Sequence, residues 1–411
     1  MSIDIKVIKQ YLEIQKIPQG WEKEWAESQA SYPGDDLFFL QSSFITEAGL
    51  KSGLKPDAVE VLIAVARELS ACPGLSGILW HAHYLLFKKK EASLDSILPF
   101  LNIQGLREEN LRVLKVLILF SGYPQLVSFY QEKGIPDRIL QDTLKDISIW
   151  MEDHKAKTGK WGFEQLGWLM NHLQGKLFRI GRLQFMPAVF EGNIRVYRNI
   201  HTQKTMVFSE PGIQYRADGL INGTNDIYEN DGIWTSSLEE SSESIRGILI
   251  NSQAHAVNHL EEISLSDYEL VLTKGNPIME VHIPAGQPLK HEDCFKSYQA
   301  ALSFYDKFFP EVQFNGFCCT SWLLDNQLSL LLPAKSNIVQ FQQDYLIYPY
   351  KGSDTQTFER VFGGKPDNLK QAPRNTPLQA AILDYCLQGN NMRMGAGFIL
   401  KQWVIEGKLS H

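Results

Sequence analysis

The stretch "MEVHIPAGQPLKHEDC", Met279–Cys294, places a glutamate and a histidine where they could act together. Side chains alternate along a strand, so Glu280 and His282 share one polar face of the strand predicted at the start of this stretch. Either side chain could take a proton from a reacting group as a general base. His282 ends the predicted strand, which is the end at which α/β sheets place their chemistry. In the alternative, structural interpretation, His282 bonds a loop carbonyl and Glu280 pairs with a nearby Lys or Arg.

The loop "PAGQPL" follows this strand and leads into a predicted helix, an order that often places an anionic ligand at the helix N-terminus. The backbone of Ala285, Gly286 and Gln287 would supply the donors. Three features weaken that interpretation. The loop has one glycine, Pro288 removes an amide donor, and the acidic pair 292–293 already satisfies the positive end of the helix. A plain turn with a well-charged helix start is the alternative.

Two further segments bring polar residues to predicted strand ends. In "GRLQF", Arg182 and Gln184 share one strand face, and Arg182 could bind a carboxylate or phosphate in a bidentate manner or form an interdomain ion pair. In "CCTSW", Ser321 could cap the following helix. We favour this role over that of a nucleophile, because no G-x-S-x-G pattern surrounds it. Trp322 could line a ligand pocket, and core packing is the alternative. A hydrolase that uses Cys319 or Ser321 would need an activating histidine within reach.

Two motifs that suggest ligand sites have the wrong context. "RMGAGF", 393–398, follows a predicted helix and precedes a predicted strand, which is the reverse of a phosphate loop. We expect Gly395 and Gly397 to allow close backbone approach instead. His255 and His259 have the spacing of metal ligands on a helix, but "HAVNH" lacks the glutamate of the zinc motif, so we predict no metal.

Two parts of the chain, with different sequence patterns, form the elements that position these residues. The first part has helical spacing of apolar residues, for example at 59–69, 75–90, 107–120 and 137–154. The polar segment 155–162 is the predicted seam, with one more helix, 163–176, after it. Strands are then predicted at 177–187, 193–200, 244–250, 279–283, 314–322, 337–349 and 397–405, with helices at 264–275, 290–309, 323–332 and 376–389. We therefore predict an all-helical domain, 1–155, followed by a mixed-sheet α/β domain, 156–411.

Composition narrows the classes of partner. The chain has 411 residues, a formal net charge of −7, 44% hydrophobic residues and 21% charged residues. A mildly acidic chain without a basic block argues against nucleic acid and anionic membranes, and no apolar run reaches the roughly 18 residues of a membrane helix. Five scattered cysteines without C-x-x-C spacing favour a reducing cytoplasm, and the acidic, amphipathic start does not suggest a signal peptide.

Several segments resemble a known bacterial family, the acyltransferase domain-containing proteins. The similar segments are "KWGFEQLGWLMNHLQGKLFRIGRLQF", "VHIPAGQPL", "SWLLDNQLSLLLPAKSNIVQFQ" and "TPLQAAILDYCLQG", which together run from about Trp161 to the C-terminus. That family pairs a helical N-terminal domain with a C-terminal domain similar to the GNAT N-acetyltransferase fold. The loop departs from the GNAT pattern Q/R-x-x-G-x-G/A, because Gly286 is its one glycine.

The resemblance implies transfer of an acyl group from acyl-CoA or acetyl-CoA, as co-substrate, to an amine acceptor. In that hypothesis His282, helped by Glu280, is the base, and Arg182 with the 285–287 backbone binds the donor. Gln184, Ser321 and Trp322 would line the substrate pocket. The alternative is a non-catalytic protein that binds a small molecule or peptide on the same scaffold. The acceptor, the acyl chain length and the oligomeric state stay open.

Overall fold

The computed structural model describes residues 4–12, 20–72, 74–89 and 94–409, so parts of the predicted amphipathic start and Lys90 lie outside the described residues. The chain divides into two compact units, residues 1–180 and 181–411. The predicted seam, 155–162, lies at the end of helix α9 (Asp137–Thr158), and the helix that follows, α10 (Leu166–Leu173), packs on helices of the first unit.

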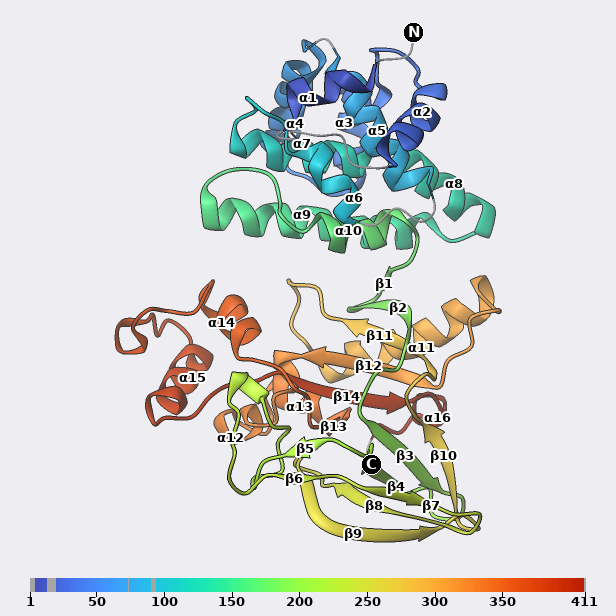
Figure 1. Cartoon of the computed structure of the whole chain (residues 1–411), viewed down its shortest axis with the longest axis vertical. Helices are drawn as coiled ribbons and strands as arrows, with labels where there is room; N and C mark the ends of the chain where they lie inside the picture. The colour runs from blue at the N-terminus through green and yellow to red at the C-terminus, as the bar shows by residue number, and fades with distance from the viewer. Residues whose placement is uncertain (1–3, 13–19, 73, 90–93, 410–411) are drawn as a thin grey trace. The chain divides into compact units, whose positions relative to one another are not determined.

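The first unit is helical, as the apolar spacing predicts (Figure 1). Its further elements are α1 (Ile8–Tyr11), α2 (Trp21–Ala30), α3 (Ser42–Lys51), α4 (Pro56–Ser70), α5 (Leu75–Phe87), α6 (Leu94–Ile97), α7 (Glu108–Phe120), α8 (Tyr123–Lys133) and the short strand β1 (Phe178–Ile180). Helix α4 illustrates how these segments form helices. Pro56 lies in its first turn, where the fixed φ of proline suits a helix, and its apolar residues at spacings of three and four are buried.

Helix α5 is almost wholly buried, and it carries two histidines into the interior. The rings of His81 and His83 are almost fully buried, and their Nδ1 atoms contact Ser28 Oγ and Ser121 Oγ at 2.8 Å each. Burial lowers the pKa of His81 to about 3 and that of His83 to about 4, with the charges of Lys89 and Lys88 acting in the same direction. Both histidines are therefore neutral at physiological pH.

One segment satisfies the length and composition of a membrane span. It runs over Glu108–Lys133, and 67% of its most apolar window is buried inside the described structure. Such burial is typical of a core helix.

The second unit is built on a mixed sheet (Figure 1). Five of its strands lie in the order β2 (Leu183–Val189), β11 (Pro277–His282), β12 (Gly316–Ser321), β14 (Gly395–Leu400) and β13 (Leu346–Tyr348). Strands β11 and β12 are parallel, and the other neighbours are antiparallel. This arrangement confirms the predicted fold class, a helical first part followed by a mixed-sheet α/β second part.

Helix α11 (His291–Phe308) covers one face of this sheet. Its apolar stripe is buried at Cys294, Tyr298, Ala301 and Tyr305. The ring of Tyr298 packs against Phe185 of β2 and Phe317 of β12, with centroid distances of 6.2 and 5.2 Å. Met279 and Val281 are buried, as expected of the apolar face of β11, whereas Glu280 and His282 are partly exposed.

The segment of the sequence between β2 and β11 forms a second sheet. Its strands are β3 (Ile194–Asn199), β4 (Thr205–Ser209), β7 (Leu238–Glu240), β8 (Ser244–Ile250), β9 (Ala256–Ser264) and β10 (Tyr268–Leu272), beside a small hairpin of β5 (Gln214–Tyr215) and β6 (Trp234–Thr235). Tyr197, Phe208, Ile245 and Ile263 form its buried core. The predicted helix at 264–275 is wrong, because β10 pairs antiparallel with β3 over this segment.

The remaining helices are α12 (Leu328–Leu331), α13 (Asn337–Gln343), α14 (Thr355–Phe362), α15 (Pro377–Leu387) and α16 (Lys401–Glu406). Two predicted strands are each half helix. Residues 337–343 form α13 because the Ser336 side chain accepts a hydrogen bond from the Val339 N–H and caps the helix. The last segment leaves β14 at Leu400 and continues as α16.

Candidate functional site

The Glu280–His282 pair lines a cavity of about 310 Å³ in the second unit. The cavity lies on the face of β11 that Glu280 and His282 share, whereas Met279 of the same strand is fully buried. Its wall combines strand residues with the segments that follow β2 and β13: Val189, Phe190, Glu191, Gly192, Asn193, Ile221, Ile278, Val281, Cys318, Thr320, Tyr348, Pro349, Tyr350 and Lys351.

The two predicted catalytic side chains contact each other. His282 Nε2 lies 3.4 Å from Glu280 Oε2, and the two side chains are 29% and 41% exposed. A partly exposed imidazole beside a carboxylate can accept a proton, because the carboxylate stabilises the imidazolium that forms. Strand pairing fixes both backbones, since Glu280 pairs with Met186 and His282 pairs with Gln184 across β2.

The ladder between the parallel strands β11 and β12 ends before the strands do. It pairs Met279 with Phe317 and Glu280 with Cys318 and goes no further between these two fully described strands, although β11 continues to His282 and β12 to Ser321, so the pairing leaves a gap. Backbone groups at a gap of this kind can bind an extended ligand by adding it as a strand. The gap adjoins the cavity, because Val281 and Thr320 also line it.

The loop before α11 is exposed at Ala285, Gly286 and Gln287. Gly286 has a φ of +116°, a backbone conformation that favours glycine. The guanidinium of Arg182 donates to the carbonyls of Pro284 at 2.9 Å and Pro288 at 3.3 Å, on either side of the exposed residues. Arg182 therefore braces the loop from both ends.

The three predicted pocket residues have separate environments. Gln184 is 1% exposed within β2. Ser321 caps the 3₁₀ helix Trp322–Leu324 by accepting a hydrogen bond from the Leu323 N–H at 3.2 Å, which confirms the capping interpretation. Trp322 packs on an apolar cluster of Leu328, Ile382 and Met392, and neither it nor Ser321 lines the cavity.

The two thiols of β12 lack the character of nucleophiles. Burial raises the pKa of Cys319 to about 12, and burial together with the charges of Cys319 and Glu280 raises the pKa of Cys318 well above its usual value. Both thiols are thus neutral at pH 7, whereas the nucleophilic form of cysteine is the thiolate.

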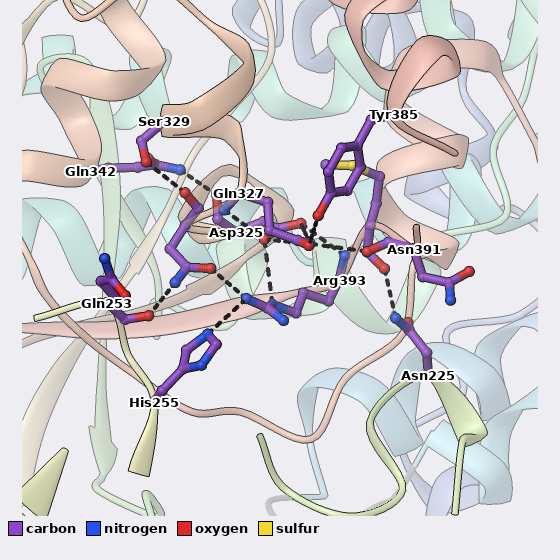
Figure 2. Close-up of polar contacts among 12 residues, drawn as sticks. Asn225, Gln253, His255, Asp325, Gln327, Ser329, Gln342, Tyr385, Asn391 and Arg393 are labelled. Atoms are coloured by element: carbon purple, nitrogen blue, oxygen red, sulfur yellow. Dashed lines mark hydrogen bonds and ion pairs between the residues drawn. The ribbon is translucent and has the colours of Figure 1, made fainter. Parts of the chain in front are cut away.

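A second polar cluster lies at the start of β14 (Figure 2). Asp325 is fully buried and accepts hydrogen bonds from the backbone N–H groups of Gln327 and Arg393. The Arg393 guanidinium reaches Asn326 Oδ1 at 2.7 Å and His255 Nε2 at 3.4 Å. These contacts engage Arg393 of the "RMGAGF" segment within the fold.

The glycines of that segment allow close approach, as predicted. A Cβ at Gly395 would lie 1.9 Å from the carbonyl oxygen of Leu324, and one at Gly397 would lie 2.9 Å from Tyr345 Cβ. The predicted helix at 323–332 is broken at Asp325, whose side chain bonds the Gln327 amide. His255 precedes β9 and His259 lies within it, so their spacing belongs to extended chain.

Sequence reasoning missed most of the cavity wall. Three wall residues follow strand ends, a position that could have identified them: Glu191, Tyr350 and Lys351. They come together only because strands from distant segments pair in the sheet. Cys318 and Thr320 share a face of β12 by simple alternation. Over the described ranges, no group of three or more His, Cys, Asp or Glu side chains is arranged to hold a metal ion.

Comparison with known proteins gives matches along most of the chain. A family model described as the N-acyltransferase N-terminal domain matches residues 44–175, and one described as the GNAT-like C-terminal domain matches residues 177–399. No curated protein sequence matches.

Solved structures show a similar fold. One is an acyltransferase mutant in complex with octanoyl-CoA, and another is an acyltransferase in complex with decanoyl-CoA and teicoplanin. Each has a TM-score of 0.65 and 19% sequence identity, and the match covers 97% of this chain and 99% of the other. A third, an acyltransferase with decanoyl-CoA, matches with a TM-score of 0.53 at 18% identity over 86% of this chain and 98% of its own.

Proposed function

The chain belongs to the family defined by an N-acyltransferase N-terminal domain and a GNAT-like C-terminal domain, and on this basis we propose that it transfers an acyl group from an acyl-CoA to an amine. The observation that carries the proposal is the Glu280–His282 pair, which lines a cavity beside the end of the ladder between two parallel strands. The acyl-CoA complexes of the structurally similar acyltransferases support the choice of donor.

The proposed reaction forms a C–N bond and breaks the thioester C–S bond. The amine nitrogen attacks the thioester carbonyl carbon, and the CoA sulfur leaves with the electron pair of the C–S bond. His282, oriented by Glu280 at 3.4 Å, takes the proton that the amine loses, and a proton neutralises the thiolate. A well-placed base of this kind contributes about 10²–10⁴-fold in rate.

The donor would use the strand gap and the loop before α11. The pantetheine arm of CoA contains amide groups, which can pair with backbone groups at the gap between β11 and β12. The exposed backbone of Ala285, Gly286 and Gln287 is the proposed contact for the diphosphate, with Arg182 holding the loop in shape. The acidic residues Glu292 and Asp293 in the first turn of α11 oppose that contact.

Two measurements test the proposal. Isothermal titration with acetyl-CoA, octanoyl-CoA and decanoyl-CoA measures donor binding, and release of free CoA thiol in the presence of amines measures transfer. We expect His282→Ala to lower transfer at least about 100-fold without a matching loss of donor affinity. If none of the three thioesters binds at millimolar concentration, the transferase proposal fails.

A matched control is available on another strand. His259 and Glu261 form a similar pair two residues apart in β9, at 3.8 Å, outside the cavity. His259→Ala should leave transfer unchanged. An equal loss of transfer in both variants would contradict a specific role for His282.

The second candidate is a non-catalytic binding protein that uses the same cavity. Arg182 supports it, because its guanidinium donates to loop carbonyls rather than pointing to an open anion site. If His282→Ala changes only the melting temperature, this second function is favoured.

A further inference from the structure

Lys351 is a cavity residue that the proposed chemistry leaves unused. It follows β13 and lines the wall of the cavity that contains Glu280 and His282. Its Nζ lies 3.2 Å from the hydroxyl oxygen of Tyr228 and 5.0 Å from the centroid of the Tyr228 ring. Both side chains are exposed, and a cation–aromatic contact of this kind contributes about 0.5–1 kcal/mol at an exposed site, which favours this position of an otherwise flexible lysine.

The absence of a side chain at Gly223 leaves room for the Lys351 side chain. A Cβ at Gly223, where φ is +95°, would lie 2.9 Å from Lys351 Nζ and 2.8 Å from the Tyr228 ring. Glycine therefore leaves the space that both side chains occupy. The same loop fixes the lysine's segment, because the Asn225 N–H donates to the Gly352 carbonyl at 3.0 Å.

The acids of the cavity have other partners. Glu191 pairs with Lys274 at 3.2 Å, and Glu280 pairs with His282 at 3.4 Å. Lys351 forms no ion pair with a carboxylate within the part of the chain that the structure describes. The cavity thus has an acidic Glu280–His282 side and, separately, a positioned cation.

This charge arrangement matches a small molecule with opposite charges at its two ends. We propose that Lys351 binds a carboxylate of the acceptor, so that the acceptor is an amino acid or a short peptide whose amine reaches the Glu280–His282 pair. The inference rests on the proposed acyl transfer. The volume agrees, since about 310 Å³ lies at the lower end of the range of about 300–1,000 Å³ found for small-molecule sites.

The faces of the sheet assign this anion to the acceptor rather than to the donor. The loop proposed for the CoA diphosphate, 285–287, leads into α11, which covers the opposite face of the sheet. That loop does not line the cavity, whereas Lys351 does. Tyr350 and Phe190 give the same cavity aromatic surface for the apolar part of an amino acid.

The test uses pairs of amines that differ only in the carboxylate: phenylalanine and phenylalaninamide, leucine and leucinamide, and Gly-Phe and its amide. Isothermal titration measures each affinity for the wild type and for Lys351→Ala and Lys351→Arg. We expect the wild type to prefer the carboxylate by about tenfold, a preference that Lys351→Ala abolishes and Lys351→Arg retains in part. The affinity for octanoyl-CoA should change less than about twofold in both variants.

Lys307→Ala is the matched control. Lys307 also lies 5.0 Å from the centroid of an aromatic ring, that of Phe308, but it does not line the cavity. It should keep the wild-type carboxylate preference.

Three outcomes would overturn the inference. The wild type could bind acids and amides equally, it could bind none of the carboxylate amines, or Lys351→Ala could weaken octanoyl-CoA binding instead, which would assign the lysine to the donor. The first two outcomes leave the proposed transfer standing if acyl-CoA binds. A failure of acyl-CoA binding beside an intact carboxylate preference would instead contradict the transfer.

Discussion

Arg393 donates its backbone N–H to the carboxylate of Asp325 at 2.9 Å, and its guanidinium Nε lies 3.5 Å from the other oxygen of the same carboxylate. Asp325 follows β12, and Arg393 precedes β14, its antiparallel neighbour. Burial raises the pKa of Asp325, whereas the Arg393 charge and the backbone donors lower it. One buried acid thus fixes the connection between two strands of the cavity sheet.

Asp325→Ala should destabilise the second unit by about 3–5 kcal/mol, because it removes the fully buried carboxylate that pairs with the Arg393 guanidinium, whose side chain is 12% exposed. The exposed pair of Arg374 and Asp384, at 2.7 Å, provides the control, and Asp384→Ala should cost less than about 1 kcal/mol. Urea unfolding followed by tryptophan fluorescence measures both. Similar losses in the two variants would contradict a special role for the buried pair.

Gly395→Ala should destabilise the protein by about 1–3 kcal/mol or more, because the new methyl group would meet the Leu324 carbonyl, which belongs to the backbone. Gly247→Ala is the comparison. There the nearest atom, at 2.4 Å, belongs to the Leu238 side chain, which can rotate away. Melting temperatures should therefore fall much further for Gly395→Ala, and equal shifts would show that the backbone yields at residue 395.

Asp344 should make stability fall as the pH rises through the acidic range. Its pKa is raised to about 6, chiefly by burial, with His291 at 2.6 Å acting in the opposite direction. The folded state binds a proton more tightly than the unfolded state, so this stability is present below about pH 4 and is lost as the pH rises through about 6. In Asp344→Asn this dependence should vanish. Urea unfolding from pH 3.5 to 7 measures it, and parallel curves for the two proteins would refute the prediction.

His81 and His83 should make the helical unit sensitive to acid. Their pKa values are lowered to about 3 and about 4, so the stability that they contribute is present above about pH 6.5 and is lost as the pH falls through these values. The double variant His81→Asn/His83→Asn should lose stability at pH 7 but show a shallower loss between pH 6.5 and 4. Helical circular dichroism measures both effects. The exposed His201→Asn is the control and should keep the wild-type slope.

Helices and strands with a strong periodicity of their own could be predicted from the sequence. Those that depend on pairing with distant segments could not. Helix α11 has a complete apolar stripe, and β11 alternates clearly. The segment 264–275 contains good helix formers, yet pairing with β3 makes it extended. Glu280 and His282 could be identified from the sequence as a polar face. The position of Lys351 could not be predicted, because it depends on contacts with Tyr228 and Gly223, which are distant in the sequence.

The inserted second sheet has a consequence for how the chain reaches its native state. Its ends already meet, because the Phe190 N–H donates to the Asn276 carbonyl at 2.8 Å and the Gly275 N–H donates to the Phe190 carbonyl at 2.9 Å. Val189 and Pro277 then pair directly across β2 and β11. If residues 190–276 fold first, they bring these strands together and reduce the entropy lost when a long loop closes. The insertion can thus act as an internal template for assembly of the cavity sheet.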